Sequence, residues 1–200
     1  MRELSLLETR VLGTLYEKQH TVPDSYPLTL NALVSGCNQK TSRSPVMEVS
    51  EADVQGALDA LKSLNLVMET SGGRVSRYSH NVERVLQVPS QSAAILTVLM
   101  LRGPQTGGEL RINSERLHKF ADISAVDAFL QELSGRSLVT QLARQPGSRE
   151  ARWAHLLSGT PQAEVVAQPE AATSDLSALR GEVAALRDLV DRIAKHVGIT

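Results

Sequence analysis

Hydrophobic residues recur in the same order at two places along the chain. One set of apolar positions matches a second at a constant offset of 72 residues: Val54, Leu58, Leu61, Leu66 and Val67 correspond to Val126, Leu130, Leu133, Leu138 and Val139. In each set the first three positions form one face of a helix, and the Leu-Val pair begins a strand. The match resumes at an offset of 75 between residues 77–80 and 152–155. An internal repeat of this kind predicts a duplicated structural unit.

Each copy carries two further helical patterns ahead of this helix and strand. The first helix is marked by an apolar stripe, at Leu6, Leu7, Val11, Leu12 and Leu15 in one copy and at Ile95, Leu96 and Leu99 in the other. Ser90 and Ser92 are candidate N-caps of the latter. Second helices are expected over residues 28–37 and 106–120. The third helices are expected to begin at Ser50 with Asp53, and at Asp122.

Three helices followed by a β-hairpin is the plan of a winged-helix domain. The predicted fold is therefore mainly α with small β-hairpins (α+β). We expect two tandem winged-helix domains, the first over residues 1–84 and the second over residues 85–158. The alternative is a generic three-helix domain with a hairpin, but finding the same order twice favours the winged-helix plan.

Several separated motifs resemble one specific family. They are YPLTLNAL at residues 26–33, CNQK at 37–40, SPVM at 44–47, RGPQT at 102–106, GELR at 108–111, RQPG at 144–147 and AHLL at 154–157. Together they resemble the YceH-like family of uncharacterised bacterial proteins. The resemblance covers residues 4–157, implies tandem winged helices and carries no established activity.

The chain beyond the repeat has a different pattern. Residues 159–173 contain two prolines and no sustained periodicity, which predicts a flexible linker. Residues 174–198 carry a heptad repeat with Leu176, Val183, Val190 and Val197 at positions a and Leu179, Leu186 and Ile193 at positions d. β-Branched residues at a with Leu at d favour a parallel two-stranded coiled coil, so this helix predicts a homodimer. The alternative is one amphipathic helix folded back onto the globular part.

Composition narrows the class of protein. Apolar residues make up 42% and charged residues 22% of the chain, which is typical of a globular protein. The net charge of -1 does not indicate a nucleic-acid or membrane partner, so any such role depends on a local patch. Cys37 is the single cysteine, which excludes a disulfide within the chain. No signal core or membrane-length apolar run is present, so a cytoplasmic location is expected.

Positive charge lies beside the predicted third helices rather than on them. Residues 51–64 carry three acids and one lysine, and residues 122–136 carry three acids ahead of Arg136. Asn and Gln read adenine edges, and hairpin arginines hold phosphates or enter a minor groove. The candidate nucleic-acid-binding residues are therefore Asn38, Gln39, Lys40, Arg43, Arg74, Arg77, Arg144, Arg149 and Arg152. The second helix of copy two adds Arg111, Arg116 and Lys119. For each, the alternative is a solvated side chain paired with an acid.

No motif for catalysis or for a cofactor stands out. The glycine-rich residues 103–108 lack a Walker lysine and a preceding strand. The five histidines show no metal-ligand spacing and no cysteine companions. We therefore expect a protein that is not an enzyme and holds no cofactor or metal.

Two functions remain open at this point. A DNA-binding, transcription-regulator-like role follows from the winged-helix prediction. A non-catalytic protein–protein assembly module would instead present its acidic third helices to partner proteins. The candidate partners are therefore DNA, other proteins and a second copy of the chain, with no membrane.

The heptad repeat generates a test of self-association. Truncation after Ser158 should leave the globular part folded and lower the oligomeric state, because it removes the apolar seam that needs a partner helix. Light scattering of full-length and truncated protein measures the two masses. Identical masses would remove the coiled-coil hypothesis.

Overall fold

The computed structural model describes residues 2–144, 147–148 and 150–160. The predicted linker from residue 161 onward and the heptad positions from Leu176 to Val197 lie outside the described residues. The described part has an α+β fold, as the sequence predicts. Residues up to Pro161 belong to one compact unit, and the division into domains at residue 84 stays a prediction.

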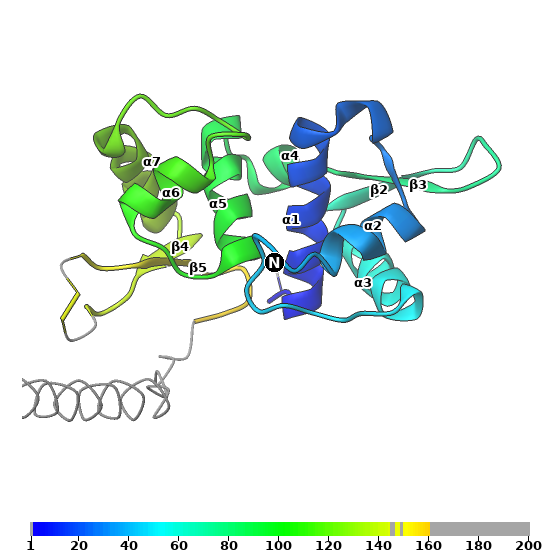
Figure 1. The fold of residues 1–200 in the computed structure, drawn as a ribbon, viewed down its shortest axis with the longest axis horizontal. Helices are drawn as coiled ribbons and strands as arrows, with labels where there is room; N and C mark the ends of the chain where they lie inside the picture. The colour runs from blue at the N-terminus through cyan, green and yellow to red at the C-terminus, as the bar shows by residue number, and fades with distance from the viewer. Residues whose placement is uncertain (1, 145–146, 149, 161–200) are drawn as a thin grey trace, which may run out of the picture. The chain divides into compact units, whose positions relative to one another are not determined.

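The first half contains three main helices and a three-stranded sheet (Figure 1). Its elements in order are α1 (Leu6–Thr21), the short 3-10 helix η1 (Pro23–Ser25), β1 (Leu28–Thr29), α2 (Leu30–Cys37), α3 (Glu51–Ser63), β2 (Val67–Thr70) and β3 (Arg77–His80). The sheet is antiparallel in the order β1-β3-β2, and Leu28 lies opposite Tyr78. A short helix, α4 (Val82–Leu86), which the hydrophobic pattern does not predict, leads into the second half.

The second half repeats this order. It contains α5 (Ser90–Arg102), α6 (Gly107–Asn113), α7 (Ile123–Gly135), β4 (Val139–Gln141) and β5 (Trp153–His155). The two hairpins share one register, since Val67 lies opposite His80 and Val139 lies opposite His155. An isolated bridge between Gln105 and Trp153 stands where β1 pairs with β3 in the first half. The duplication predicted from the sequence is thus present in the pairing of the strands.

The same turn connects the third helix to the hairpin in both halves. Asn65 and Ser137, 72 residues apart, both adopt left-handed backbone conformations, with φ of 59° and 55°. The next amide in each half reaches back to the helix: Leu66 N donates to Leu61 O at 3.0 Å, and Leu138 N to Leu133 O at 2.9 Å. This is the Schellman arrangement that ends a helix. It explains the five-residue spacing that recurs between the helical face and the strand.

The predicted caps of the third helices are confirmed. The Ser50 hydroxyl accepts from Asp53 N, and the Asp53 carboxylate bonds back to Ser50 N, which completes a capping box. The Asp122 carboxylate accepts from Ala125 N at 2.8 Å. The predicted caps of α5 are wrong, because the N-cap is Pro89 and Ser90 is already helical.

Two second-helix boundaries also differ from the prediction. Residues 28 and 29 form strand β1, so α2 begins only at Leu30, with Thr29 as its cap. Helix α6 ends at Asn113, far short of residue 120. The chain turns there around Ser114, a buried residue whose carbonyl accepts from both Leu117 N and His118 N. Arg116 and Lys119 therefore lie in a connection and not on a helix.

Helices α1 and α5 lie at the centre of the described unit. Residues 8–16 of α1 and 92–101 of α5 are buried without interruption. The two helices pack closely, since a Cβ added at Gly13 would lie 3.0 Å from the Leu101 side chain. One hydrophobic cluster consequently runs through both halves.

A second glycine permits the contact between α1 and α2. A Cβ added at Gly36 would lie 2.6 Å from Cγ2 of Thr14, so Gly36→Ala should lower the free energy of unfolding by about 1–3 kcal/mol through overpacking. The matched control is Gly56→Ala on α3, where an added Cβ meets nothing within 4 Å. That change should raise stability by up to about 1 kcal/mol through helix propensity. Chemical denaturation measures both.

A double variant isolates the cause. Combining Gly36→Ala with Thr14→Ser removes the obstructing methyl group and keeps the hydroxyl, so it should recover part of the lost stability. If Gly36→Ala is as stable as the original chain, the result would contradict the close packing of Gly36 on α2 against Thr14 on α1.

Candidate nucleic-acid interface

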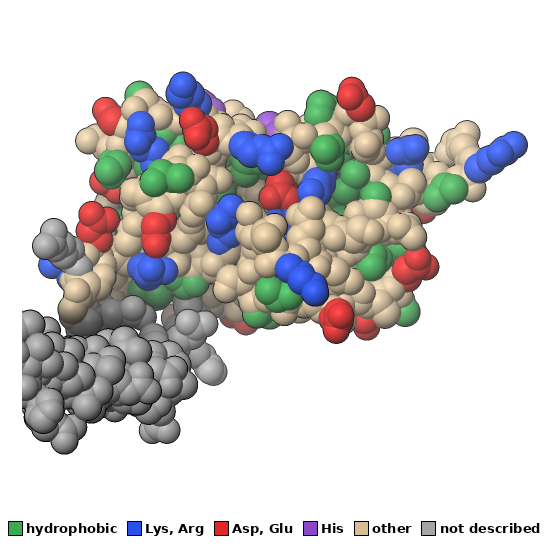
Figure 2. All heavy atoms as spheres, viewed as in Figure 1, with side chains coloured by type: hydrophobic (Ala, Val, Ile, Leu, Met, Phe, Trp, Pro, Cys, Tyr) green, Lys and Arg blue, Asp and Glu red, His purple; other side chains and the backbone are tan. Residues whose placement is uncertain are grey.

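The β2–β3 hairpin protrudes from the helices of the first half (Figure 1). Arg74 lies in its turn and Arg77 begins β3, and both are exposed. Arg77 donates to the carbonyl of Pro27 at 2.7 Å, and within the described residues neither arginine pairs with a carboxylate. Figure 2 shows basic side chains along this hairpin up to its far end. Of the predicted site, these two arginines are the best placed to meet an anionic ligand.

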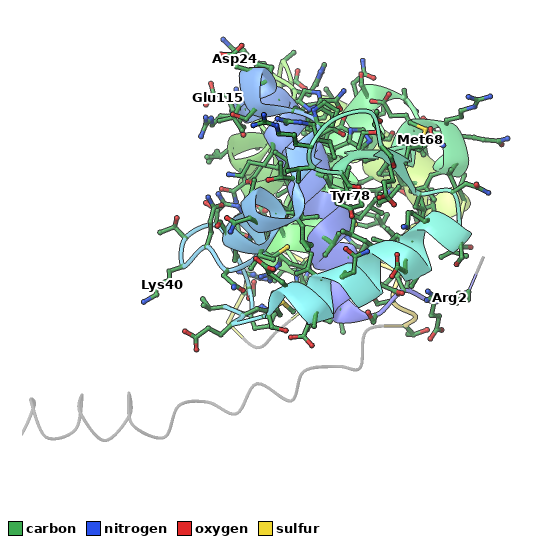
Figure 3. All side chains as sticks on the ribbon, turned by 90° about the vertical axis from the view of Figure 1, so that its right-hand side faces the viewer. Arg2, Asp24, Lys40, Met68, Tyr78 and Glu115 are labelled. Atoms are coloured by element: carbon green, nitrogen blue, oxygen red, sulfur yellow. The ribbon has the colours of Figure 1, made fainter. Side chains whose placement is uncertain are left out.

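Apolar side chains accompany these arginines. Met68 and Val75 are 51% and 58% exposed, and Figure 3 shows Met68 on the side of the molecule that carries the hairpin. The single acid of strand β2, Glu69, is held by Lys62 at 2.7 Å. The hairpin surface is therefore basic and partly apolar.

The connection of residues 38–43 is largely closed to a ligand. The Asn38 amide group is used at both ends, donating to Val49 O at 2.9 Å and accepting from Val49 N at 2.8 Å. The Gln39 carbonyl oxygen accepts from Arg43 at 2.9 Å. The Asn38 amide is therefore not free to read a base edge, and the Gln39 amide has its oxygen already paired. Lys40 is the exposed member of the set, and Figure 3 shows it pointing away from the body of the molecule.

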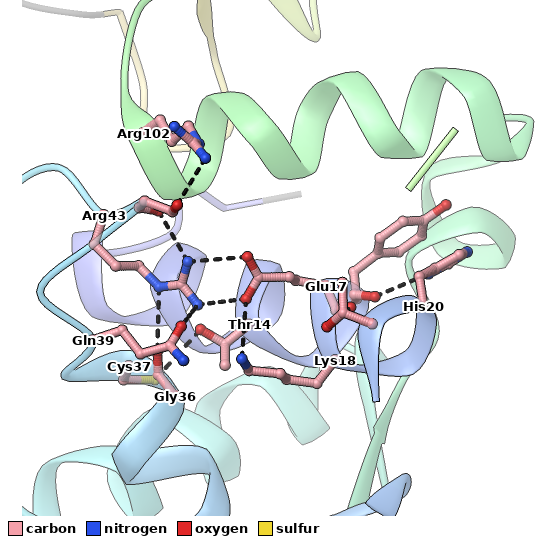
Figure 4. A network of polar contacts seen from close by, with 12 residues as sticks. Thr14, Glu17, Lys18, His20, Gly36, Cys37, Gln39, Arg43 and Arg102 are labelled. Atoms are coloured by element: carbon pink, nitrogen blue, oxygen red, sulfur yellow. Dashed lines mark hydrogen bonds and ion pairs between the residues drawn. The ribbon is translucent and has the colours of Figure 1, made fainter. Parts of the chain in front are cut away.

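Arg43 is an interior residue. Its side chain has 0% exposure, and its guanidinium donates to both carboxylate oxygens of Glu17, at 2.5 and 3.1 Å. Its Nε donates to Gly36 O at 3.2 Å (Figure 4). An arginine held this way on an internal carboxylate is not available to a phosphate.

The same connection joins the two halves. Ser44 N donates to Leu101 O at 2.8 Å, and Arg102 donates to the Ser42 hydroxyl at 2.8 Å (Figure 4). These bonds tie residues 42–44 to the end of α5. The connection expected from the sequence to be a ligand surface thus serves internal packing.

A second buried arginine, Arg10, also holds this connection through hydrogen bonds. Arg10 on α1 is fully buried and donates to the carbonyls of Cys37 at 3.1 Å and Pro45 at 2.7 Å. Burial, and then the charge of Arg43, lowers the pKa of Arg10. Burial also raises the pKa of the adjacent Cys37 thiol to about 11, so this cysteine is a neutral core residue.

The second hairpin offers less free charge than expected. Arg152 donates to Glu109 at 3.1 Å and to Pro104 O at 2.9 Å, so its charge is compensated. Arg144 is exposed and lines an open hollow of about 600 Å³ between α6, α7 and the β4–β5 hairpin, where the acids Asp127 and Glu150 also lie. Arg149 lies outside the described residues.

The third helices present acids to solvent. On α3, Asp59 and Glu69 of the neighbouring strand both hold Lys62, and hydrogen bonds first to Glu69 and then to Asp59 raise the lysine pKa. The Ser50 hydroxyl lowers the pKa of Asp53, the third helical residue of the capping box. On α7, Asp127 and Glu132 are exposed. Neither helix therefore offers a face that suits the phosphates of a major groove.

The sequence predicted one basic cluster along a helix that reaches residue 120, but two of its three members lie beyond the end of α6. Arg111 is exposed on α6, while Arg116 and Lys119 are exposed on the connection from α6 to α7. Arg111 and Lys119 line a small hollow of about 80 Å³ with the highly exposed Ile112. The positions of Arg116 and Lys119 depend on where α6 ends, and the apolar pattern did not predict this end.

Two histidines of the hairpins, His80 and His155, occupy structural positions. His80 packs against Tyr16 with tilted rings whose centroids are 4.8 Å apart, and burial lowers its pKa to about 4, with a smaller contribution from His20. Burial lowers the pKa of His155, its counterpart in the second hairpin, to about 4 as well. Across residues 2–144, 147–148 and 150–160 no group of three or more His, Cys, Asp or Glu residues could hold a metal ion. None of the helices described there is long and apolar enough to cross a membrane.

Comparison with known proteins identifies a family. Residues 4–148 match the family described as a protein of unknown function, DUF480, and the chain belongs to this family. A UPF0502 protein of Dechloromonas aromatica is 61% identical over 190 residues, which is 92% of this chain and 89% of the relative. A UPF0502 protein of Methylibium petroleiphilum is 59% identical over 199 residues, 98% and 85% of the two chains. One from Burkholderia pseudomallei is 55% identical over 213 residues, 100% and 91%. The bacterial family of unknown function expected from the motifs is thereby confirmed.

The buried position of Arg43 leads to a stability prediction. Arg43→Met should lower the free energy of unfolding by about 3 kcal/mol, because it removes the buried, bidentate partner of Glu17 and leaves only Lys18, at 3.7 Å, beside the carboxylate. Lys40→Ala, on the same connection, should change it by less than about 0.5 kcal/mol. The double variant Glu17→Met, Arg43→Met should recover part of the loss, since it removes both members of the buried pair. Denaturant titration of the three variants is the measurement, and equal stability of Arg43→Met and Lys40→Ala would contradict the buried pair.

Proposed function

We propose that this chain is a non-catalytic, transcription-regulator-like DNA-binding protein built from two winged-helix modules. The repeated order of three helices and a hairpin, ended by the same Schellman turn at Asn65 and Ser137, supports this plan. The YceH-like resemblance implies the same plan. In each module the β2–β3 or β4–β5 hairpin is the wing.

The observation that carries the proposal is the exposed pair of arginines on the protruding first wing. Arg74 and Arg77 have no carboxylate partner within the described residues, and Arg144 is exposed in the loop that follows β4. Arginines on such a wing bind phosphate oxygens or enter a minor groove. The acidic faces of α3 and α7 keep these helices away from the phosphates. The wings, rather than the third helices, therefore carry the affinity for DNA.

A second candidate function is protein–protein assembly, and the acidic solvent faces of α3 and α7 favour it. In this alternative the third helices bind basic surfaces of partner proteins. Both functions are compatible with a homodimer formed by residues 174–198 and with a cytoplasmic location.

Binding of duplex DNA at varied salt concentration tests the proposal. The variant Arg74→Ala, Arg77→Ala, Arg144→Ala should bind more weakly, and the slope of log affinity against log salt should fall in magnitude by about 0.9 for each phosphate that is no longer neutralised. Arg84→Ala is the control, because it removes an exposed cation from α4 rather than from a wing. Fluorescence anisotropy with a labelled duplex measures both quantities. No binding by the unaltered chain at low salt would refute DNA binding and favour the assembly function.

A further inference from the structure

The two halves differ in how they use the connection between the second and third helices. Counted from the ends of α2 and α6, the connections align at an offset of 76, because Asn38 N donates to Val34 O and Ser114 N donates to Leu110 O, each at 3.0 Å. This alignment places Lys40 opposite Arg116 and Arg43 opposite Lys119. The same two positions of the connection are therefore cationic in both halves.

The first helices explain why only one connection is closed. The buried apolar positions Val11, Leu12 and Leu15 match Ile95, Leu96 and Leu99, which aligns α1 with α5 at an offset of 84. In this alignment Glu17, the partner of Arg43, corresponds to Leu101. The second half thus has Leu101 at the position of Glu17, the carboxylate that pairs with the buried Arg43 in the first half. Lys119 has no such partner on α5 and is exposed.

The second connection is also free of the contacts that close the first. Residues 42–44 are bonded to α5 through Ser44 N and the Ser42 hydroxyl. Arg116 and Lys119 form no ion pair within the part of the chain that the structure describes. Arg111 joins them, because its guanidinium donates to Ala121 O at 3.4 Å and lines the same hollow as Lys119.

The local charge is positive despite two nearby acids. Glu115 lines the hollow, and Asp122 is committed to the cap of α7. Figure 2 shows basic side chains over α6 and the connection that follows it, with acidic side chains among them. Three exposed cations lie within nine residues. Each can form a charge-assisted hydrogen bond with a phosphate oxygen.

We propose that Arg111, Arg116 and Lys119 form a phosphate anchor through which the second half holds the backbone of duplex DNA. The inference rests on the proposed function and names the part of the surface that binds phosphate. Lys and Arg side chains that neutralise phosphates supply the sequence-independent part of the affinity for DNA. Contacts of this type position the duplex and carry no base specificity.

The experiment uses the full chain and two labelled duplexes of unrelated sequence. The variant Arg111→Gln, Arg116→Gln, Lys119→Gln should bind both duplexes more weakly by the same factor. The magnitude of its salt slope should fall by about 0.9 for each phosphate that the variant no longer binds. The variant Arg116→Lys, Lys119→Arg keeps both charges and should retain the slope. Circular dichroism shows whether the neutral variant is folded, and Arg116→Gln alone, which changes a side chain free of hydrogen bonds within the described residues, repeats the test at one position.

The outcomes separate the anchor from the proposed function. If the glutamine variants leave affinity and slope unchanged while the wing variant weakens binding, the anchor is wrong and DNA binding stands. If the loss of affinity depends on the duplex sequence, the residues read bases and the anchor is equally refuted. If the unaltered chain binds no DNA at low salt, both proposals fail together.

Discussion

The packing of α1 against α5 is the contact on which the rest of the described structure depends. Each helix is buried through its middle, so neither is an amphipathic helix with one face in water. The absence of a side chain at Gly13 permits the approach of Leu101. Because each helix also belongs to the core of its own half, separation of the halves would expose apolar surface on both. The hydrophobic effect thus makes one cluster of what the sequence presents as two copies.

Buried charge secures the first half to this centre. Arg10 satisfies backbone carbonyls at the end of α2 and in the following connection, and Arg43 satisfies Gly36 and Glu17. Hydrogen bonds compensate most of the cost of burying these two guanidinium groups, although Nε of Arg10 finds no partner within the described residues. The second half has no Glu17 equivalent, and its connection is left at the surface. A duplicated sequence has therefore produced two connections with different physical roles.

Local patterns predicted much of this fold. The repeat positions, the caps at Ser50 and Asp122 and the two hairpins depend on residues close together in the chain, and periodicity and cap signals reveal such features. The end of α6 was missed because Ser114 stops the helix through its own local bonds while the apolar pattern continues to Phe120. The structural role of Arg43 was missed because its partner lies 26 residues away on another helix. A polar, basic segment looks the same in sequence whether its cation faces solvent or a distant carboxylate.

The continuous core has a mechanical consequence for the two hairpins. They project on opposite sides of the α1–α5 pair, as Figure 1 shows, and the two helices that carry them pack directly against each other. The pair therefore links the two hairpins through one packed core. A ligand long enough to touch both hairpins would meet them at a separation set by this core, so less entropy would be lost in aligning one half with the other. Such a frame would select a ligand by the distance between its contact points.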